Sequence, residues 1–510
     1  MVFFKRAATS AAAISIFMTG SAAFADVTAQ QVWADWKTYL ESSGYAVEAS
    51  EVQSGDTLNV TDVTMSIDIP EEDSALAMEL GELTFTENGD GTVDVSLPSI
   101  MPIVAVFTGP DGDMVRTELE YTHTGLTMTA SGSPEDMSYA YAAAEMGVRL
   151  VGVSGDEALG PFPDGTARMT IADIAGTTRV MVNTLRKTDQ KMTSGPLSYD
   201  LDFEDPESPD ARMIIKGKLG GTDFAATTSM PLEMDASDMA AAMAAGFSVD
   251  GKMMYRNGSS QFTLDEDGSV TEGRTSSESG EFDIAMSDDG LTYALTTTGM
   301  NLAMSGGDIP LPVELAMQET GFNLTVPVSK SDEEQDFELG LTLGDFTMSE
   351  MLWGMFDPGG QLPRDPATIA LDLGGKVKLF YDLFDPEQME AVESEGAIPG
   401  EVNALDINAL TVRAAGAELT GEGAFTFDNT DLETFDGMPA PDGEVDLKLT
   451  GANGLLDTLI AMGLLPEDQA MGVRMMMGLF AVPGEGEDSL TSTIEVKSDG
   501  QVLANGQRIK

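Results

Sequence analysis

Apart from carboxylates, the side chains that most often carry chemistry are scarce in this chain of 510 residues. It has one histidine, His123, no cysteine, and 86 Asp and Glu residues. Without cysteine it cannot form a disulfide, an iron–sulfur cluster, a thiolate zinc site or a cysteine nucleophile. His123 stands beside an expected turn, where an ordinary strand-end role is favoured over that of a general base. No catalytic residue, metal site or cofactor is therefore predicted.

The carboxylates leave one enzymatic alternative open. A pair of them can hydrolyse a glycosidic bond, but their abundance gives no location for such a pair. A secreted carboxylate-based hydrolase is kept as an alternative function. The formal net charge of −60 excludes a nucleic-acid-binding protein that relies on attraction to phosphate. It favours a soluble monomer with a surface suited to salty water.

Methionine is more informative, because 33 are present and several are clustered. Met239 and Met243, like Met471 and Met475, have the one-turn helical spacing of paired thioether ligands for Cu(I). Gap-filling in the core is the favoured interpretation, and an adaptable apolar binding surface is the next. The candidate ligand-binding residues are apolar side chains of the second half: Trp353, Phe356, Leu459, Met471, Met475 and Phe480.

Basic residues cluster between Arg179 and Lys218. Four of them are candidates for docking an anionic headgroup or partner: Arg179, Arg186, Lys187 and Lys191. Because acids are interspersed in the same segment, internal ion pairing across a hairpin is the favoured interpretation.

Residues 1–25 have the pattern of a secretory signal peptide. Lys5 and Arg6 precede an apolar stretch from Ala7 to Met18, and Ala23-Phe24-Ala25 offers small residues at the positions that a signal peptidase reads. The apolar stretch is too short to cross a bilayer of about 30 Å as a helix. We expect cleavage after Ala25, export to the periplasm, and no transmembrane segment in the mature chain.

The elements that position these residues are predicted to be mostly strands. Apolar and polar residues alternate around Asn-Gly and Asp-Gly turns, which supply the positive φ of tight hairpins. Such turns occur at 88–91, 267–268, 289–290 and 499–500, and Thr124-Gly125 is a similar candidate. The pattern predicts a mainly β (β-rich α+β) protein. We expect an elongated, curved, mostly antiparallel sheet with one buried and one wet face and a few docked helices.

Few helices are expected. Thr28 and Gln31 form a capping box before an apolar helix face. Further helices are predicted from Ser133 to Met146, over 235–246, and after Ser349. A C-terminal helical pair is predicted at about 453–480, with Asn453 capping the first helix and Pro466 opening the second. The second helix is apolar nearly all round, so we expect it to be covered.

Domain boundaries are indistinct in the sequence. We expect an N-terminal β-rich lobe over residues 26–230 with a leading helix. A C-terminal β-rich lobe over 231–510 carries the helical pair. One continuous domain is the alternative, because a long sheet can run as one.

Two stretches resemble a known family. They are Leu352–Pro366, which reads LWGMFDPGGQLPRDP, and the tail from Gly454 through Pro466 to Gln507. Both resemble an uncharacterised family of exported alphaproteobacterial proteins, catalogued as domain of unknown function twenty-one twenty-five, over most of the mature chain. The resemblance implies an exported location and assigns no catalytic residue. Read physically, the first stretch is a corner that follows a short apolar helix.

The leading hypothesis is a non-enzymatic envelope protein that binds an apolar or amphipathic ligand. It rests on the one-faced sheet, the Met-rich helical pair and the missing nucleophile and phosphate-loop motifs. Besides the hydrolase, a purely structural or interaction protein of the periplasm is the alternative.

Overall fold

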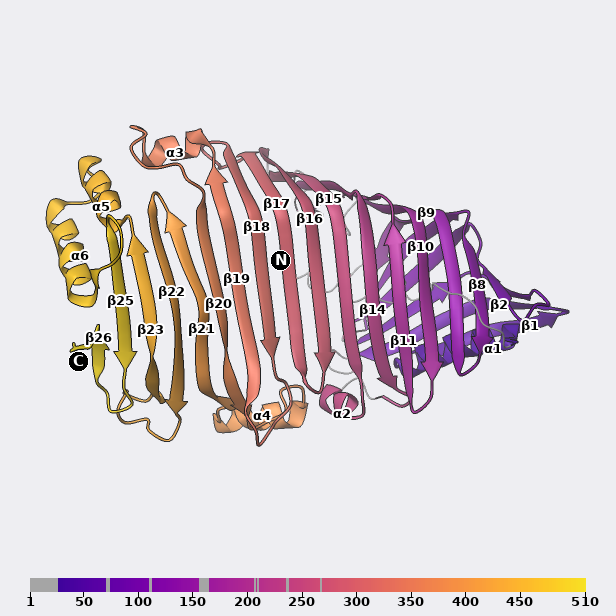
Figure 1. Ribbon diagram of the computed structural model, residues 1–510. Helices are drawn as coiled ribbons and strands as arrows, with labels where there is room; N and C mark the ends of the chain where they lie inside the picture. Colours follow the sequence, from indigo (N-terminus) through magenta and orange to yellow (C-terminus); the bar gives the residue numbers. More distant parts are fainter. Residues whose placement is uncertain are drawn as a thin grey trace. The chain divides into compact units, whose positions relative to one another are not determined.

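The computed structural model describes residues 26–69, 74–109, 112–155, 165–205, 208, 211–234, 238–266 and 268–510. The predicted signal peptide, residues 235–237 of a predicted helix and Asp267 of a predicted turn lie outside these ranges. Within them the chain forms 27 strands and six helices. The strand pairs are antiparallel, so the predicted β-rich, mostly antiparallel fold is confirmed (Figure 1). The chain divides into two compact units, one up to Glu272 and one from Gly273.

The first unit begins with a helix that is followed by strands. Its elements are α1 (Ala29–Ser42), β1 (Ala46–Ser54), β2 (Thr57–Ile69), β3 (Ser74–Leu80), β4 (Leu83–Glu87), β5 (Val93–Ser96), β6 (Ile100–Thr108), β7 (Met114–Thr124), β8 (Thr127–Ser133), β9 (Asp136–Gly155), β10 (Gly165–Val182), β11 (Leu185–Ser194), β12 (Leu197–Glu204), β13 (Arg212–Leu219), β14 (Gly221–Pro231), α2 (Met239–Ala244) and β15 (Ser248–Glu266). Strand β16 (Ser269–Ser287) spans the division between the units. The predicted turn at 88–91 joins β4 and β5 as a hairpin, which confirms it.

In this unit, two consecutive strands twice lie end to end and pair with a single long strand. β7 and β8 run in the same direction along successive parts of β9, with Gly125 between them at a φ of 64°. β11 and β12 pair in the same way along β10, opposite Asp173, whose φ is 50°. The hairpin turn predicted at Thr124-Gly125 is therefore wrong. The left-handed conformation of Gly125 belongs to a bulge, which bends a strand without reversing it.

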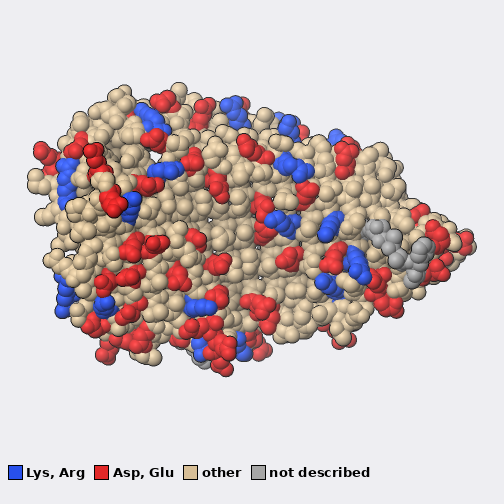
Figure 2. Space-filling model, viewed as in Figure 1, with Lys and Arg blue, Asp and Glu red and all other residues tan. Residues whose placement is uncertain are grey.

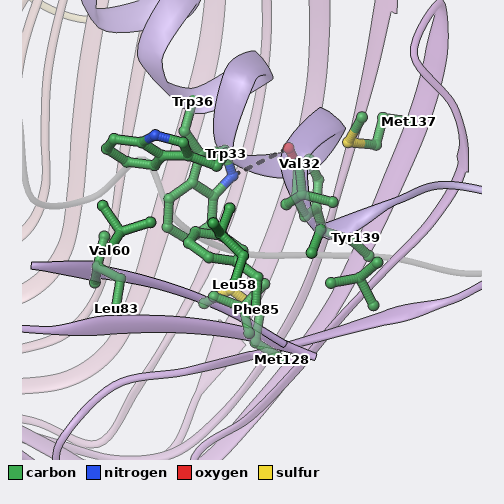
Figure 3. Close-up of a cluster of buried hydrophobic side chains, with 14 of the residues drawn as sticks. Val32, Trp33, Trp36, Leu58, Val60, Leu83, Phe85, Met128, Met137 and Tyr139 are labelled. Carbon is green, nitrogen blue, oxygen red and sulfur yellow. Dashed lines mark hydrogen bonds between the residues drawn. The ribbon is translucent and has the colours of Figure 1, made fainter. Parts of the chain in front are cut away.

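Helix α1 packs on the sheet of the first unit as the sequence predicts. Thr28 and Gln31 form the capping box at its start. The rings of Trp33 and Trp36 pack on Phe85 of β4, with centroid distances of 6.1 and 5.3 Å (Figure 3). Burial of this face stabilises helix and sheet together, at roughly 25 cal/mol per Å² of apolar surface removed from water.

The helix predicted from Ser133 to Met146 is wrong. Pro134 and Glu135 form the turn of a hairpin in which Ser133 of β8 pairs with Asp136 of β9. The residues that follow alternate into the buried core: Met137, Tyr139, Tyr141 and Ala143. The alanine-rich composition favours a helix, but packing of every second side chain against the core outweighs that preference.

The second unit continues with long strands and four helices among the described residues. Its elements are β17 (Gly290–Gly306), β18 (Val313–Val326), β19 (Gln335–Met348), α3 (Glu350–Phe356), β20 (Ala367–Leu379), α4 (Pro386–Glu395), β21 (Gly400–Ala414), β22 (Ala417–Asp428), β23 (Ala440–Thr450), α5 (Ala452–Ala461), α6 (Glu467–Phe480), β24 (Val482–Pro483), β25 (Ser489–Val496), β26 (Val502–Ala504) and β27 (Gln507–Arg508). From β17 to β23, strands adjacent in sequence pair side by side (Figure 1). β25 and β26 form the hairpin predicted at Asp499-Gly500.

The predicted C-terminal helical pair is confirmed as α5 and α6, which contact each other. The cap of α5 differs from the prediction. The Asp488 carboxylate accepts hydrogen bonds from the backbone N–H groups of Asn453 and Gly454 at 3.1 and 2.9 Å, and Asn453 donates its side-chain amide to Asp488. Asn453 is therefore not the capping acceptor. No helix in the described ranges is long and apolar enough to cross a bilayer.

Candidate ligand-binding surfaces

The segment after α3 folds as a corner that is held together by Asp357. Its carboxylate accepts backbone hydrogen bonds from Gln361 at 2.9 Å and Leu362 at 2.8 Å. Arg364 lies 3.4 Å from the same carboxylate and stacks 4.5 Å from the centroid of the Trp353 ring. The Gln361 N–H contributes most to lowering the pKa of Asp357; Leu362 and Arg364 add to it, and burial opposes it. Trp353, predicted to bind a ligand, is in contact with this corner.

We expect Asp357 to make the free energy of unfolding fall at acid pH. Because its folded-state pKa is lowered, its carboxylate stabilises the fold above the unfolded-state pKa. That stabilisation is lost as the pH falls through the folded-state pKa. Asp357→Asn should remove this part of the dependence in urea unfolding measured at neutral and acid pH. Asp365→Asn, at an exposed carboxyl of the same segment, is the control; a pH dependence that survives D357N intact would contradict the assignment.

The other predicted apolar residues lie mostly on the surface. Phe356 is exposed at the end of α3. On α6, Ala470 is buried, whereas Met471 and Met475 are 65 % and 73 % exposed. The expectation that this helix is covered is therefore wrong. Leu459 on α5 and Phe480 at the end of α6 are half-buried.

The four predicted basic residues do not form one patch. Arg179, Lys187 and Lys191 share a face of β10 and β11, where Arg179 makes a bidentate pair with Asp136 at 2.7 and 2.6 Å. Lys187 lies 4.0 Å from Asp189. Arg186 is on the opposite face and is buried. Internal pairing thus accounts for Arg179 and Arg186.

An extensive apolar surface covers one face of the second unit. In successive strands from β17 to β21, five apolar residues stand directly opposite one another: Leu295, Phe322, Leu341, Leu371 and Leu410. A neighbouring row continues to β25: Leu343, Ile369, Val412, Leu419, Leu449 and Leu490. We call these two rows the apolar face. Six of its members are exposed: Leu295, Phe322, Leu341, Leu343, Ile369 and Val412.

The intervening residues point to the other face and are mostly polar. One row there contains Thr342, Ala370, Thr411, Thr420 and Lys448. Acidic side chains with Lys and Arg among them are spread over the surface that Figure 2 shows. The alternation predicted from sequence is therefore present. The apolar face, however, is partly exposed to solvent, whereas the sequence predicts that it is buried.

A buried polar cluster lies beside α1 in the first unit. Arg186 donates from Nη1 to Asp35 at 2.6 Å, and the two side chains are only 8 % and 7 % exposed. Tyr139 donates to the second oxygen of Asp35 at 2.6 Å and accepts a hydrogen bond from Trp36 Nε1 at 3.0 Å. The guanidinium also lies 5.0 Å from the centroid of the Tyr39 ring. Sequence reasoning missed Asp35 and Tyr139, because no local signal links them to Arg186.

This cluster forms part of the wall of a cavity of about 260 Å³. Helix α1 lines one side with Asp35, Trp36, Tyr39 and Leu40. Strands β9, β10, β11, β14 and β15 supply the rest: Tyr139, Thr178, Val180, Arg186, Thr188, Gln190, Phe224, Ala226, Thr228, Met230 and Val249. The cavity is therefore polar near Arg186 and apolar along β14 and β15.

Other chemical groups give little indication of catalysis. No group of three or more His, Asp or Glu side chains in the described part of the chain is arranged to hold a metal. His123 Nε2 lies 3.1 Å from the Leu97 carbonyl oxygen, and its ring lies 5.9 Å from that of Tyr121. Asp382 and Asp385 share Gln388 as a hydrogen-bond donor, but both have lowered pKa values. A general acid needs a raised pKa, so this pair does not support the hydrolase alternative.

Comparison with known proteins identifies a family. A family described as an uncharacterised protein conserved in bacteria, DUF2125, matches residues 196–509. No curated protein and no solved structure matches the chain. The matched residues include the whole apolar face of the second unit and exclude α1.

Proposed function

Because the chain belongs to DUF2125, an uncharacterised bacterial family, we propose a function from its own residues. It is an exported, non-enzymatic envelope protein that binds the hydrocarbon part of an amphipathic ligand. The ligand lies along the apolar face of the second unit. The observation that carries this proposal is the run of exposed aliphatic and aromatic side chains in direct cross-strand register.

Exposure of this kind is unusual for a protein that binds nothing. Soluble monomers rarely expose contiguous apolar patches beyond a few hundred Å², and larger patches mark binding sites. Each methylene that a ligand buries on such a face contributes about 0.8 kcal/mol. A straight acyl chain suits a face built from parallel rows of side chains. The polar opposite face keeps the protein in solution.

Export is supported by the sequence of residues 1–25. Their basic start, short apolar stretch and small residues before Asp26 have the order of a cleavable leader. We infer that the mature protein begins at Asp26 and works in the periplasm. N-terminal sequencing of the protein purified from an envelope fraction tests this, and an N-terminus at Met1 would overturn it.

Binding is tested with a paired substitution on the apolar face. Leu341→Asn with Leu371→Asn should lower the affinity for the uncharged probe N-phenylnaphthylamine by about tenfold, because two adjacent aliphatic contacts are lost. Fluorescence titration of the full chain measures this affinity. Thr342→Asn with Ala370→Asn is the matched control, since these residues pair in the same two strands on the polar face.

Native mass spectrometry of protein purified without detergent supplies an independent measurement. We expect a bound amphiphile that organic extraction recovers. If no amphiphile is recovered and the probe binds both paired variants equally, the proposal fails. A purely structural or interaction role would then be favoured.

A further inference from the structure

The cavity beside α1 has features that the proposed function does not use. It lies wholly within the first unit, and none of its lining residues belongs to the apolar face. Its volume of about 260 Å³ equals that of roughly nine water molecules, at about 30 Å³ each. A polar end group and a short hydrocarbon segment would fill it.

The guanidinium of Arg186, at the polar end of the cavity, is not fully paired. A guanidinium has five N–H groups, and Asp35 accepts one of those of Arg186. The Nε of Arg186 is buried and has no acceptor among the described residues. A buried donor without an acceptor is costly, and an oxygen atom brought by a ligand would reduce that cost.

The charges around Arg186 define the class of ligand. Asp35 neutralises Arg186, and burial raises the pKa of Tyr139 well above its usual value, with Asp35 adding to the effect. Burial also raises the pKa of Tyr39. Both phenols are therefore neutral at neutral pH. An anionic ligand would add an unbalanced charge to this site in a chain that already carries a net charge of −60, and a cationic one would find Asp35 already paired.

We propose that this cavity binds an uncharged amphiphile. Its hydroxyl or carbonyl oxygen accepts a hydrogen bond from Arg186, and its hydrocarbon lies between Leu40 of α1 and Phe224, Met230 and Val249 of the sheet. Medium-chain alcohols have this chemistry and this size. The inference does not depend on the apolar face of the second unit, because the two sites share no residue.

The test compares three ligands of equal chain length on the full chain: octanol, octanoate and octylammonium. Isothermal titration calorimetry should show octanol binding at least about tenfold more tightly than either charged analogue. Equal or tighter binding of octanoate would overturn the assignment of an uncharged ligand. No binding of octanol would overturn the site itself and leave water as its occupant.

Two alanines of β14 provide matched variants. Ala226 lines the cavity, whereas Ala225 is exposed on the opposite face of the same strand. Ala226→Leu should weaken octanol binding by about tenfold, because the added side chain occupies the cavity. Ala225→Leu should leave the affinity unchanged. Equal affinities of the two variants would overturn the proposal.

A labelling experiment on the unmodified chain keeps the test valid if A226L folds poorly. An octanol that carries a diazirine group is photolysed with the wild-type protein, and the labelled peptides are identified by mass spectrometry. Labels on Phe224–Met230 or on α1 support the proposal, and labels confined to other peptides overturn it. The paired variant L341N/L371N should be labelled on Phe224–Met230 and α1 as strongly as the wild type, which separates this site from the apolar face.

Discussion

Replacing Arg186 with methionine is expected to lower the free energy of unfolding by about 3–5 kcal/mol. The substitution leaves the Asp35 carboxylate buried without its cationic partner, while Tyr139 still donates a hydrogen bond to it. A buried charge whose partner is removed is far more destabilising than a pair that is removed together. Arg186→Met with Asp35→Leu should therefore recover much of the loss. Urea unfolding followed by the fluorescence of Trp33 and Trp36 measures these changes.

The control for this prediction is the neighbouring residue of the same strand. Lys187 is about half exposed and lies 4.0 Å from Asp189, and exposed pairs of this kind contribute about 0–1 kcal/mol. Lys187→Met should therefore change the free energy of unfolding little. Trp353→Phe in all variants removes the tryptophan of the second unit from the signal. If R186M lowers the free energy of unfolding no more than K187M does, the Arg186–Asp35 pair does not stabilise the fold.

Local signals predicted the elements whose stability is local. The capping box of Thr28 and Gln31 predicted α1 correctly, because both hydrogen bonds form within four residues. Asp499-Gly500 predicted its hairpin for the same reason. Helix α4 was missed, although Asp385, Pro386 and Gly396 are its start and stop signals. These signals are local, so this helix is predictable from the sequence.

Elements that depend on distant partners were predicted less well. The segment after Ser133 is rich in alanine and resembles a helix, yet β7, β8 and β10 pair with it on both sides. Gly125 resembles a hairpin turn, and its role as a bulge is fixed only by the continuous pairing of β9. In both cases the sheet partner decided the conformation.

The candidate sites were the least predictable feature, because one depends on the packing of a helix on distant strands and the other on strand register. Asp35 and Arg186 are 151 residues apart. Leu341 and Leu371 are recognisable as strand residues, but only the pairing of β19 with β20 places them opposite each other. The Met-rich helix α6 drew attention by its composition. Composition does not distinguish a covered helix from an exposed one.

The two units treat their apolar residues differently. In the first, α1 covers sheet residues such as Phe85, and the result is a closed core (Figure 3). In the second, Phe322 and its neighbours on the apolar face are exposed. The proposed ligand would cover the apolar face of the second unit, as α1 covers the apolar residues of the first. One substitution made in both units tests this difference.

Phe85→Ala is expected to lower the free energy of unfolding by about 3–5 kcal/mol, since deletion of a fully buried ring leaves a cavity. Phe85 is 0 % exposed and packs on Trp33 and Trp36. Phe322→Ala removes a ring that is 37 % exposed and contacts Tyr293 at a centroid distance of 6.0 Å. It should cost about 1–2 kcal/mol, because less apolar area is lost and solvent fills the space.

Both variants are measured by urea unfolding monitored by circular dichroism, without ligand and with saturating N-phenylnaphthylamine. The ligand should stabilise the wild type and F85A by similar amounts, because a ligand that binds only the native state shifts unfolding by mass action. It should stabilise F322A less, since this ring is part of the apolar face. A cost of F322A as large as that of F85A would mean that the apolar face is closed in solution, and the protein would then have no exposed surface there for a ligand.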